Sequence, residues 1–325
     1  QATQGSILGN VTDATGATVP GAVVTIRNEG TNFTREVRTD DSGDYRVSGL
    51  EPGNYEVTIT NQGFKTFKQT KVDVVANQIK RINAALEVGD VSTTVTVEGG
   101  TAQVETETAT LSNVKTSRDF TELPLSIYGR GWANITNVTA GIQSQQCCAF
   151  LANGARGSGV NFTTDGIYFM NTITSSQGPN GFSGEIEFIQ EVKVMTANNS
   201  AEFAQVSQFA AVSKAGTNEL HGSLYWGNFN NKFSARQWQD TQKPEFTNHN
   251  MFAITNGGPV YIPRLYDGRN KTFYFFSYGG ARYRVGSRTR VSLPTPAFRQ
   301  GDFSSIANLV TIVDPLNGQP FANNR

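Results

Sequence analysis

The sequence has few of the residues from which metal centres and catalytic sites are usually built. It contains two histidines and two cysteines in 325 residues. His221 is followed by Gly-Ser-Leu and His249 by Asn-Met-Phe, so neither begins the HxxE or HExxH arrangement of a zinc peptidase. The Gly-rich stretch NGARGSG lacks the Lys-Ser/Thr pair of a phosphate-binding loop. We therefore expect no catalytic residue, no metal and no cofactor, and predict that the protein is not an enzyme.

Charged residues are also scarce, at 17% of the chain. Lys and Arg together number 27, as do Asp and Glu, so the formal net charge is zero. Without a basic excess, we expect no nucleic acid as a partner. Gly, Thr, Asn and Ser are abundant instead, which is typical of proteins made of short strands and many turns.

Long apolar runs are absent. Because no run of about 18 apolar residues occurs, the sequence predicts no transmembrane helix. A basic and apolar leader is also missing, and Gln1 is therefore interpreted as a mature N-terminus left after removal of a signal peptide. A removed signal peptide would indicate a secreted protein.

The two cysteines, Cys147 and Cys148, are adjacent. Neighbouring cysteines cannot form a standard bridge without strain, because favoured Cα separations exceed the span between neighbours. Three interpretations follow: a strained vicinal disulfide in an oxidising compartment, two free thiols in a loop, or bridges to another chain.

Residues 1–89 have the pattern of a β-sandwich. Short runs rich in Val, Ile, Thr and Tyr are separated by turns of Gly, Pro, Asp and Asn, which predicts an antiparallel sandwich of the seven-stranded type. Tyr55, Val57 and Ile59 alternate with polar residues, so we expect one face of this strand to be buried and the other to face water.

The composition changes after this region. Residues 99–119 are polar, rich in Thr and poor in large apolar side chains, as linkers are. A short helix is expected after the Leu-Pro-Leu at 123–125, and strands are expected at 186–196 and 201–216. The middle of the chain is therefore predicted to mix α and β structure.

After Glu219 the chain changes again. Longer, aromatic-rich segments such as LHGSLYWGNF and KTFYFFSYGGARYR are separated by polar loops. Leu220, Leu224 and Trp226 alternate with other residues in the first of them, a pattern typical of outer-membrane barrel strands with aromatic girdles. A few antiparallel barrel-type strands are expected here.

Taken together, these segments resemble the N-terminal part of Oar-like TonB-dependent receptors. A carboxypeptidase regulatory-like domain is indicated by GNVTDATGATVPGAVVTIRN, RTDDSGDYRVSGLEPGNYEVTITNQGF and ALEVGD. A plug domain is indicated by LPL, NGARGSGVNFTTDGI, IEFIQEVKVMTANNSAEF and SKAGTNELHGS. The resemblance implies a mainly β protein with a sandwich at 1–89, a linker at 90–115, a plug-like α/β domain at 116–218 and initial barrel-type strands at 219–325.

The resemblance also implies a TonB box, an extended segment that pairs as an added β-strand with the energy-coupling protein TonB. The stretch DVSTTVTVEG is similar to such boxes. Its central residues are Val91, Ser92, Thr93, Thr94, Val95, Thr96 and Val97. Because Thr/Val alternation is common in β proteins, the stretch is also open to interpretation as the last strand of the sandwich or as a linker.

Two functions from different classes follow. In the first, the chain is the N-terminal part of an outer-membrane transporter of a Gram-negative-type bacterium. Its plug gates the uptake of an unknown bulky solute, its regulatory-like domain lies in the periplasm, and TonB is its partner.

In the second, a truncated or proteolysed relative acts as an extracellular structural protein. Copies of it pair their strands into a fibre through a surface that includes Leu220, Leu224 and Trp226. We keep this alternative because a family barrel needs about 22 strands, whereas the residues after Glu219 supply only a few.

Overall fold

The computed structural model describes residues 3–98, 107–122, 139–145, 149–153, 160–168, 186–199, 203, 205–235, 238, 245–286 and 291–325. The described residues are mainly β-strand. The chain divides into two compact units. The first contains Gln1–Phe229 and His249–Arg282, and the second contains Asn230–Asn248 and Tyr283–Arg325.

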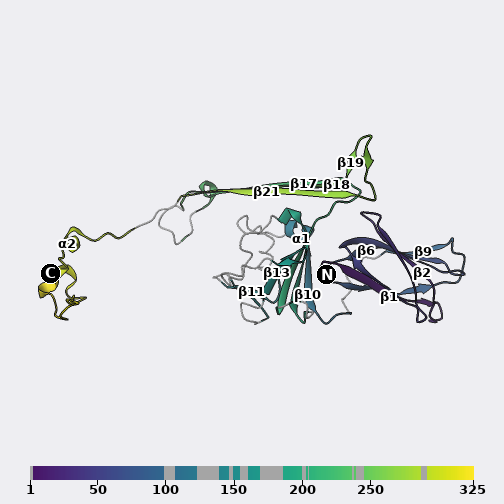
Figure 1. Cartoon of the computed structure of the whole chain (residues 1–325), viewed down its shortest axis with the longest axis horizontal. Coiled ribbons are helices and arrows are strands. Elements are labelled where there is room, and N and C mark those ends of the chain that lie inside the picture. The colour runs from purple at the N-terminus through teal and green to yellow at the C-terminus, as the bar shows by residue number, and fades with distance from the viewer. Residues whose placement is uncertain are drawn as a thin grey trace. The chain divides into compact units, whose positions relative to one another are not determined.

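The N-terminal region is a two-layer β-sandwich (Figure 1). One layer has the strand order β4-β1-β7, with β8 also paired to β1, and the other has the order β3-β2-β5-β6-β9. The strands are β1 (Gly5–Asp13), β2 (Val23–Asn28), β3 (Thr34–Arg38), β4 (Asp44–Leu50), β5 (Gly53–Thr60), β6 (Thr66–Val74), β7 (Ile79–Arg81), β8 (Ala84–Leu86) and β9 (Thr94–Glu98).

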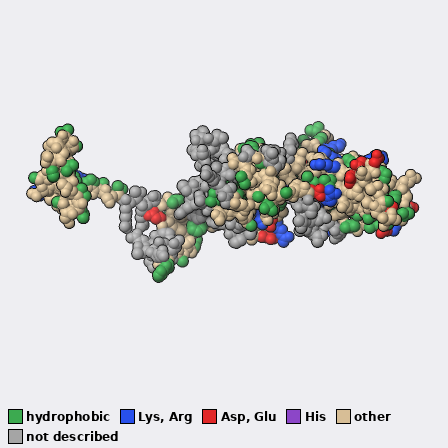
Figure 2. All heavy atoms as spheres, turned by 90° about the horizontal axis from the view of Figure 1, so that it is seen from below, with side chains coloured by type: hydrophobic (Ala, Val, Ile, Leu, Met, Phe, Trp, Pro, Cys, Tyr) green, Lys and Arg blue, Asp and Glu red, His purple; other side chains and the backbone are tan. Residues whose placement is uncertain are grey.

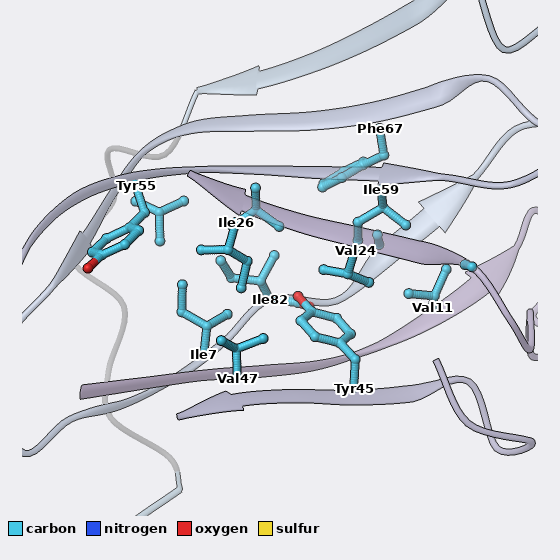
Figure 3. Packing of buried hydrophobic residues seen from close by; sticks show 14 of the residues in the cluster. Ile7, Val11, Val24, Ile26, Tyr45, Val47, Tyr55, Ile59, Phe67 and Ile82 are labelled. Atoms are coloured by element: carbon cyan, nitrogen blue, oxygen red, sulfur yellow. The ribbon is translucent and has the colours of Figure 1, made fainter. Parts of the chain in front are cut away.

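Alternation of apolar and polar residues gives each sheet of the sandwich one buried face. Tyr55, Val57 and Ile59 of β5 are at most 2% exposed, which confirms the burial that their alternation predicts. Figure 3 shows Tyr55 and Ile59 on the layer opposite the one that carries Ile7 and Val47. Burying one such side chain contributes about 1.5–3 kcal/mol, so this core is a major source of the sandwich's stability.

Some pairings in the sandwich are parallel. Strands β7 and β8 run parallel to β1, and β9 runs parallel to β6. The other pairings are antiparallel, as expected. Side chains alternate in the same way in both kinds of strand pair, so the sequence pattern did not distinguish them.

A second sheet has the order β10-β15-β16-β13-β14. Phe162 and Phe209 stack in its core, with ring centroids 4.9 Å apart. The helix expected after 123–125 lies outside the described residues. The elements of this region are β10 (Leu111–Thr116), α1 (Ser117–Glu122), β13 (Val160–Thr164), β14 (Ile167–Tyr168), η3 (Ile186–Phe188), β15 (Ile189–Ala197) and β16 (Ser207–Ser213).

Two buried ionisable residues of β15 bond to the sandwich. The backbone N–H of Ala76 donates to Glu191 at 2.7 Å, and the Nζ of Lys193 donates to the carbonyl of Asn77 at 2.7 Å. Burial, with a smaller contribution from the negative charge of Asp73, raises the pKa of Glu191 to about 7, although the Ala76 N–H and the Lys193 ammonium oppose the rise. The sandwich and the second sheet are therefore joined by hydrogen bonds of two buried side chains of β15.

Three long strands form a third sheet in the order β17-β18-β21 (Figure 1). They are the barrel-type strands that the aromatic segments predict. Their bounds are β17 (His221–Asn230), β18 (Thr247–Pro259) and β21 (Phe273–Val285). The other elements after residue 219 are η4 (Asn231–Phe233), β19 (Tyr261–Ile262), β20 (Tyr266–Asp267), α2 (Pro296–Arg299), η5 (Ser304–Ile306) and η6 (Ala322–Asn324).

Charged side chains of both signs are mixed over the sandwich on the face drawn in Figure 2. Within the sandwich, Glu56 pairs with Arg27 at 3.1 Å and with Lys68 at 2.9 Å. Within the described ranges, no helix combines the length and the apolar character needed to cross a membrane. Among the same residues, no group of three or more His, Cys, Asp or Glu side chains is placed to hold a metal ion.

Candidate functional site

The predicted box residues lie at one edge of the larger sandwich sheet. Residues 91–93 form a turn and bend, and Thr94 begins β9. Strand β9 pairs with β6 in a register that places Thr94 opposite Thr66 and Val97 opposite Gln69. The stretch interpreted as a TonB box therefore also forms the last strand of this sheet.

Hydrogen bonds hold the start of the box. The Asp90 carboxylate accepts from the N–H of Ser92 at 2.9 Å, and the bond to this amide lowers the pKa of Asp90. The Asp90 carbonyl accepts from the N–H of Thr93 at 2.9 Å. On β6, Thr66 donates from its hydroxyl to the Val91 carbonyl at 2.7 Å and from its N–H to the Thr93 carbonyl at 2.9 Å.

Hydrogen bonds and an ion pair anchor the chain to the sandwich just before this turn. The N–H of Lys65 donates to the Glu87 carbonyl at 2.8 Å, and the N–H of Gly89 donates to the Gly63 carbonyl at 3.0 Å. The Lys65 ammonium and the Glu87 carboxylate also lie 2.8 Å apart. A Cβ on Gly89 would come within 2.8 Å of the Lys65 side chain, so this close approach favours glycine.

Strand β9 contributes little to the sandwich core. Val97 is 41% exposed, and Val95 is the one half-buried side chain among those described in β9. The last residue of the core cluster along the chain is Leu86. Main-chain pairing with β6 therefore holds β9 in place, and no further strand of the described residues pairs with its other edge.

The adjacent cysteines lie outside the described residues. They occur in the connection between β11 (Ile142–Gln145) and β12 (Ala149–Ala152), which form an antiparallel pair. The three interpretations of Cys147 and Cys148 therefore stay predictions.

The predicted assembly residues are exposed. Leu220 is 73% exposed, Leu224 is 82% and Trp226 is 68%. Leu224 and Trp226 lie on β17, which is an edge strand of its sheet, and Leu220 immediately precedes this strand.

Leu224 and Trp226 belong to a larger apolar face. The hydroxyl of Ser223 lies 2.7 Å from that of Thr255, so the odd-numbered residues of β17 share a face with the buried odd-numbered residues of β18. Even-numbered residues lie on the opposite face, where Tyr274 donates to Asn256 at 2.5 Å. The exposed apolar and aromatic side chains on this face are Leu224, Trp226, Ile254, Tyr274, Phe276 and Tyr278.

His221 occupies a packing position at the start of β17. Its Nδ1 lies 2.9 Å from the carbonyl of Glu219. A Cβ on Gly257 would meet its ring at 2.8 Å, so the imidazole fills the space above a glycine in the neighbouring strand. This placement is that of a packing residue at the start of a strand.

Sequence reasoning missed Glu191 and Lys193. They lie two positions apart in the otherwise mainly apolar strand IQEVKVMTA, and residues at that spacing share one face of a strand. That pattern was the available signal. The sandwich residues Ala76 and Asn77, which bond to them, are 115 and 116 positions distant in the chain, and no local pattern links them.

Two segments of the chain match known protein families. Residues 6–87 match the carboxypeptidase regulatory-like domain, and residues 212–325 match the outer membrane beta barrel domain. The TonB-dependent transporter Oar of Myxococcus xanthus is 24% identical over 279 residues, which cover 80% of this chain and 26% of that protein. The chain thus spans 26% of the length of the curated relative it matches.

Solved structures are similar to a smaller share of the chain. The Bacillus anthracis TIE protein is 23% identical, with 26% of this chain and 17% of that chain covered at a TM-score of 0.23. Hydroxyquinol 1,2-dioxygenase from Pseudomonas putida DLL-E4 is 10% identical, with 27% and 58% covered at a TM-score of 0.23. Similarities this low carry no argument about function.

Proposed function

We propose that this chain, a relative of the Oar-like TonB-dependent transporters, is the N-terminal part of an outer-membrane transporter that takes up a bulky solute with energy supplied through TonB. The relationship itself rests on the match to Oar and on the regulatory-like and barrel domain matches, which assign the chain to the outer membrane. Oar is a transporter, which is a non-enzymatic class of protein.

Each region has a role in this proposal. The sandwich at 1–89 lies in the periplasm, the segment 90–115 contains the TonB box, and 116–218 forms the plug that gates the solute. The strands from 219 onward begin the barrel. Support for the last role comes from the exposed apolar face on β17, β18 and β21, which has the aromatic and aliphatic composition of a lipid-facing barrel surface.

One observation carries the coupling role. The box residues Val91 to Val97 end in an exposed edge strand that adds little to the core, yet the chain is anchored at Glu87 and Gly89 immediately before them. An extended segment of this kind suits recognition by strand addition, in which main-chain hydrogen bonds supply affinity.

Deleting Asp90 to Gly99 tests the coupling role. We expect the deletion to abolish capture of the chain by the immobilised periplasmic domain of TonB. The control is Glu36→Gln on β3, at the opposite edge of the same sheet, which should leave capture unchanged. Undiminished capture of the deletion variant would refute the box assignment.

A second function, self-assembly into a fibre, is favoured by a different observation. Leu224 and Trp226 are exposed on an edge strand, where pairing with another copy would cover them. Electron microscopy of the purified chain separates the two functions. Filaments that disappear in the double variant Leu224→Lys, Trp226→Lys would support assembly, and their absence from the unmodified chain at high concentration would exclude it.

A further inference from the structure

The two edges of the larger sandwich sheet differ in composition. At one edge, β3 has the sequence TREVR, with charges at Arg35, Glu36 and Arg38. At the other edge, β9 has the sequence TVTVE, with neither a charge nor a proline before Glu98. Natural sheets protect exposed edges from unwanted pairing with charged side chains, prolines or bulges. Strand β9 is therefore the unprotected edge of this sheet.

The open edge is the edge of β9 that faces away from β6. The hydrogen bonds to β6 show which residues direct their backbone N–H and C=O groups toward it. The Thr93 carbonyl accepts from the N–H of Thr66, so it points at β6. Because backbone groups of successive residues in a strand point to opposite edges, Val95 also faces β6. The N–H and C=O groups of Thr94 and Thr96 point to the open edge, where no other described strand pairs with β9.

This edge is preformed. The turn at Asp90 and the two hydrogen bonds from Thr66 hold residues 91–93, which lead into the strand. The hydrogen bonds of Glu87 and Gly89 fix the chain before the turn. A segment that is already extended and anchored loses less conformational entropy on binding than a free peptide does. Binding at the open edge would therefore use backbone groups of Thr94 and Thr96 that pair with no other described strand, and it would cost little conformational entropy.

We propose that β9 receives a strand of TonB on its open edge while it stays paired with β6, so that the sandwich and TonB form one continuous sheet. The proposal rests on the assignment of Val91 to Val97 as the TonB box. Its partner is an extended segment whose alternating N–H and C=O groups pair with those of Thr94 and Thr96. The regulatory-like domain is then the platform that presents the box to TonB.

A disulfide that locks β9 onto β6 tests the geometry directly. Lys68 lies opposite Thr96, and adjacent strands bring such pairs within the Cα range that a disulfide needs. The variant Lys68→Cys, Thr96→Cys is made in the full chain with Cys147→Ser and Cys148→Ser. Its matched control, Lys68→Ser with Thr96→Ser in the same background, also removes the ion pair of Lys68 with Glu56 but cannot lock.

We expect the oxidised, locked chain to bind the periplasmic domain of TonB within about twofold of the control. Loss of binding on oxidation, with recovery on reduction, would overturn the proposal, because it would show that β9 must leave β6 before TonB binds.

Hydrogen exchange of the unmodified chain is a second test of the proposal, and it does not require the disulfide between positions 68 and 96. On addition of TonB, the amides of Thr94 and Thr96 should gain protection, while those of Thr66 and Lys68, which face β9, should keep theirs. Loss of protection along β6 would overturn the proposal. So would protection of Thr94 and Thr96 that depends on chain concentration without TonB, since it would identify a second copy as the occupant.

A proline at the open edge tests which backbone groups bind. Thr96→Pro removes an N–H that points away from β6, a position that edge strands tolerate. Loss of that hydrogen bond should weaken TonB binding about tenfold, whereas Thr96→Ala should leave it nearly unchanged. Equal binding by both variants would exclude this edge as the docking site.

The outcomes separate this proposal from the one on which it rests. If the chain without Asp90 to Gly99 still binds TonB, the box assignment fails. If the unmodified chain binds and the deletion does not, but the lock abolishes binding, then the box assignment stands and the continuous sheet fails.

Discussion

Thr66 bonds to Val91 across 25 positions of the chain, its hydroxyl donating to the Val91 carbonyl at 2.7 Å. Its backbone N–H also donates to the Thr93 carbonyl at 2.9 Å. One residue of β6 therefore positions the turn from which β9 departs.

Replacing Thr66 by Val should loosen β9 and leave the rest of the sandwich intact. The change removes one hydrogen bond worth about 0.5–1.5 kcal/mol, so amide exchange in β9 should be about 2- to 10-fold faster. Hydrogen exchange measured by mass spectrometry checks this. Thr70→Val, further along β6 and opposite Glu98, is the matched control and should leave the exchange at Val95, whose amide faces β6, unchanged.

Replacing Ile59 by Ala should cost far more stability than any change in β9. Ile59 is fully buried in the sandwich core, and such truncations cost about 2–5 kcal/mol through lost burial and the remaining cavity. Chemical denaturation followed by circular dichroism measures the loss. The neighbouring change Thr58→Ala, on the other face of β5, should cost less than about 1 kcal/mol. Equal losses would contradict the burial pattern.

Replacing Glu191 by Gln should flatten the pH dependence of stability. The pKa of this carboxyl is about 7 in the folded protein, against an ordinary value of 4.5 when unfolded, mainly because of burial. The folded state therefore binds the proton more tightly, so the protonated carboxyl's contribution is fully present below pH 4.5 and is lost as the pH rises through about 7. The hydrogen bond from the Ala76 N–H and the charge of Lys193 oppose the rise in this pKa, and the charge of Asp73 adds to the effect of burial.

Between about pH 5 and pH 8, the unmodified chain should lose on the order of 1–3 kcal/mol of unfolding free energy relative to the Gln variant. Denaturation curves at several pH values measure this difference. Glu122→Gln is the control, because Glu122 is exposed and pairs with Arg118 on the surface of α1. If the free energies of unfolding of the Glu191→Gln variant and of the unmodified chain change equally with pH, the assignment of the raised pKa to Glu191 is wrong.

In the full-length transporter that we propose, replacing Trp226 by Lys should reduce insertion into lipid bilayers. A lysine on the lipid face of a barrel costs about 2–4 kcal/mol at the bilayer midplane, whereas changes on the other face are tolerated better. Flotation with vesicles measures insertion, and Tyr225→Lys, one residue away on the opposite face, is the control. A larger effect at Tyr225 would reverse the assignment of the two faces.

Much of the fold could be predicted because its strands are amphipathic. Burial of Tyr55, Val57 and Ile59 follows from their alternation alone, since only one face of that strand can be covered. The aromatic segments after Glu219 likewise indicated the strands of the third sheet. The parallel direction of β7, β8 and β9 could not be predicted, because alternation is the same in both directions.

In the candidate site too, the sequence predicts local strand formation, whereas the neighbours of the strand come from the tertiary structure. By itself, the sequence determined that Val91 to Val97 would be an alternating, uncharged segment capable of forming a strand. Only the tertiary structure decided that β6 is its neighbour, that Thr94 and Thr96 face an open edge, and that Glu191 is buried against Ala76. The physical reason is that strand propensity and alternation are local properties, whereas edge position and burial depend on which distant segments pack together.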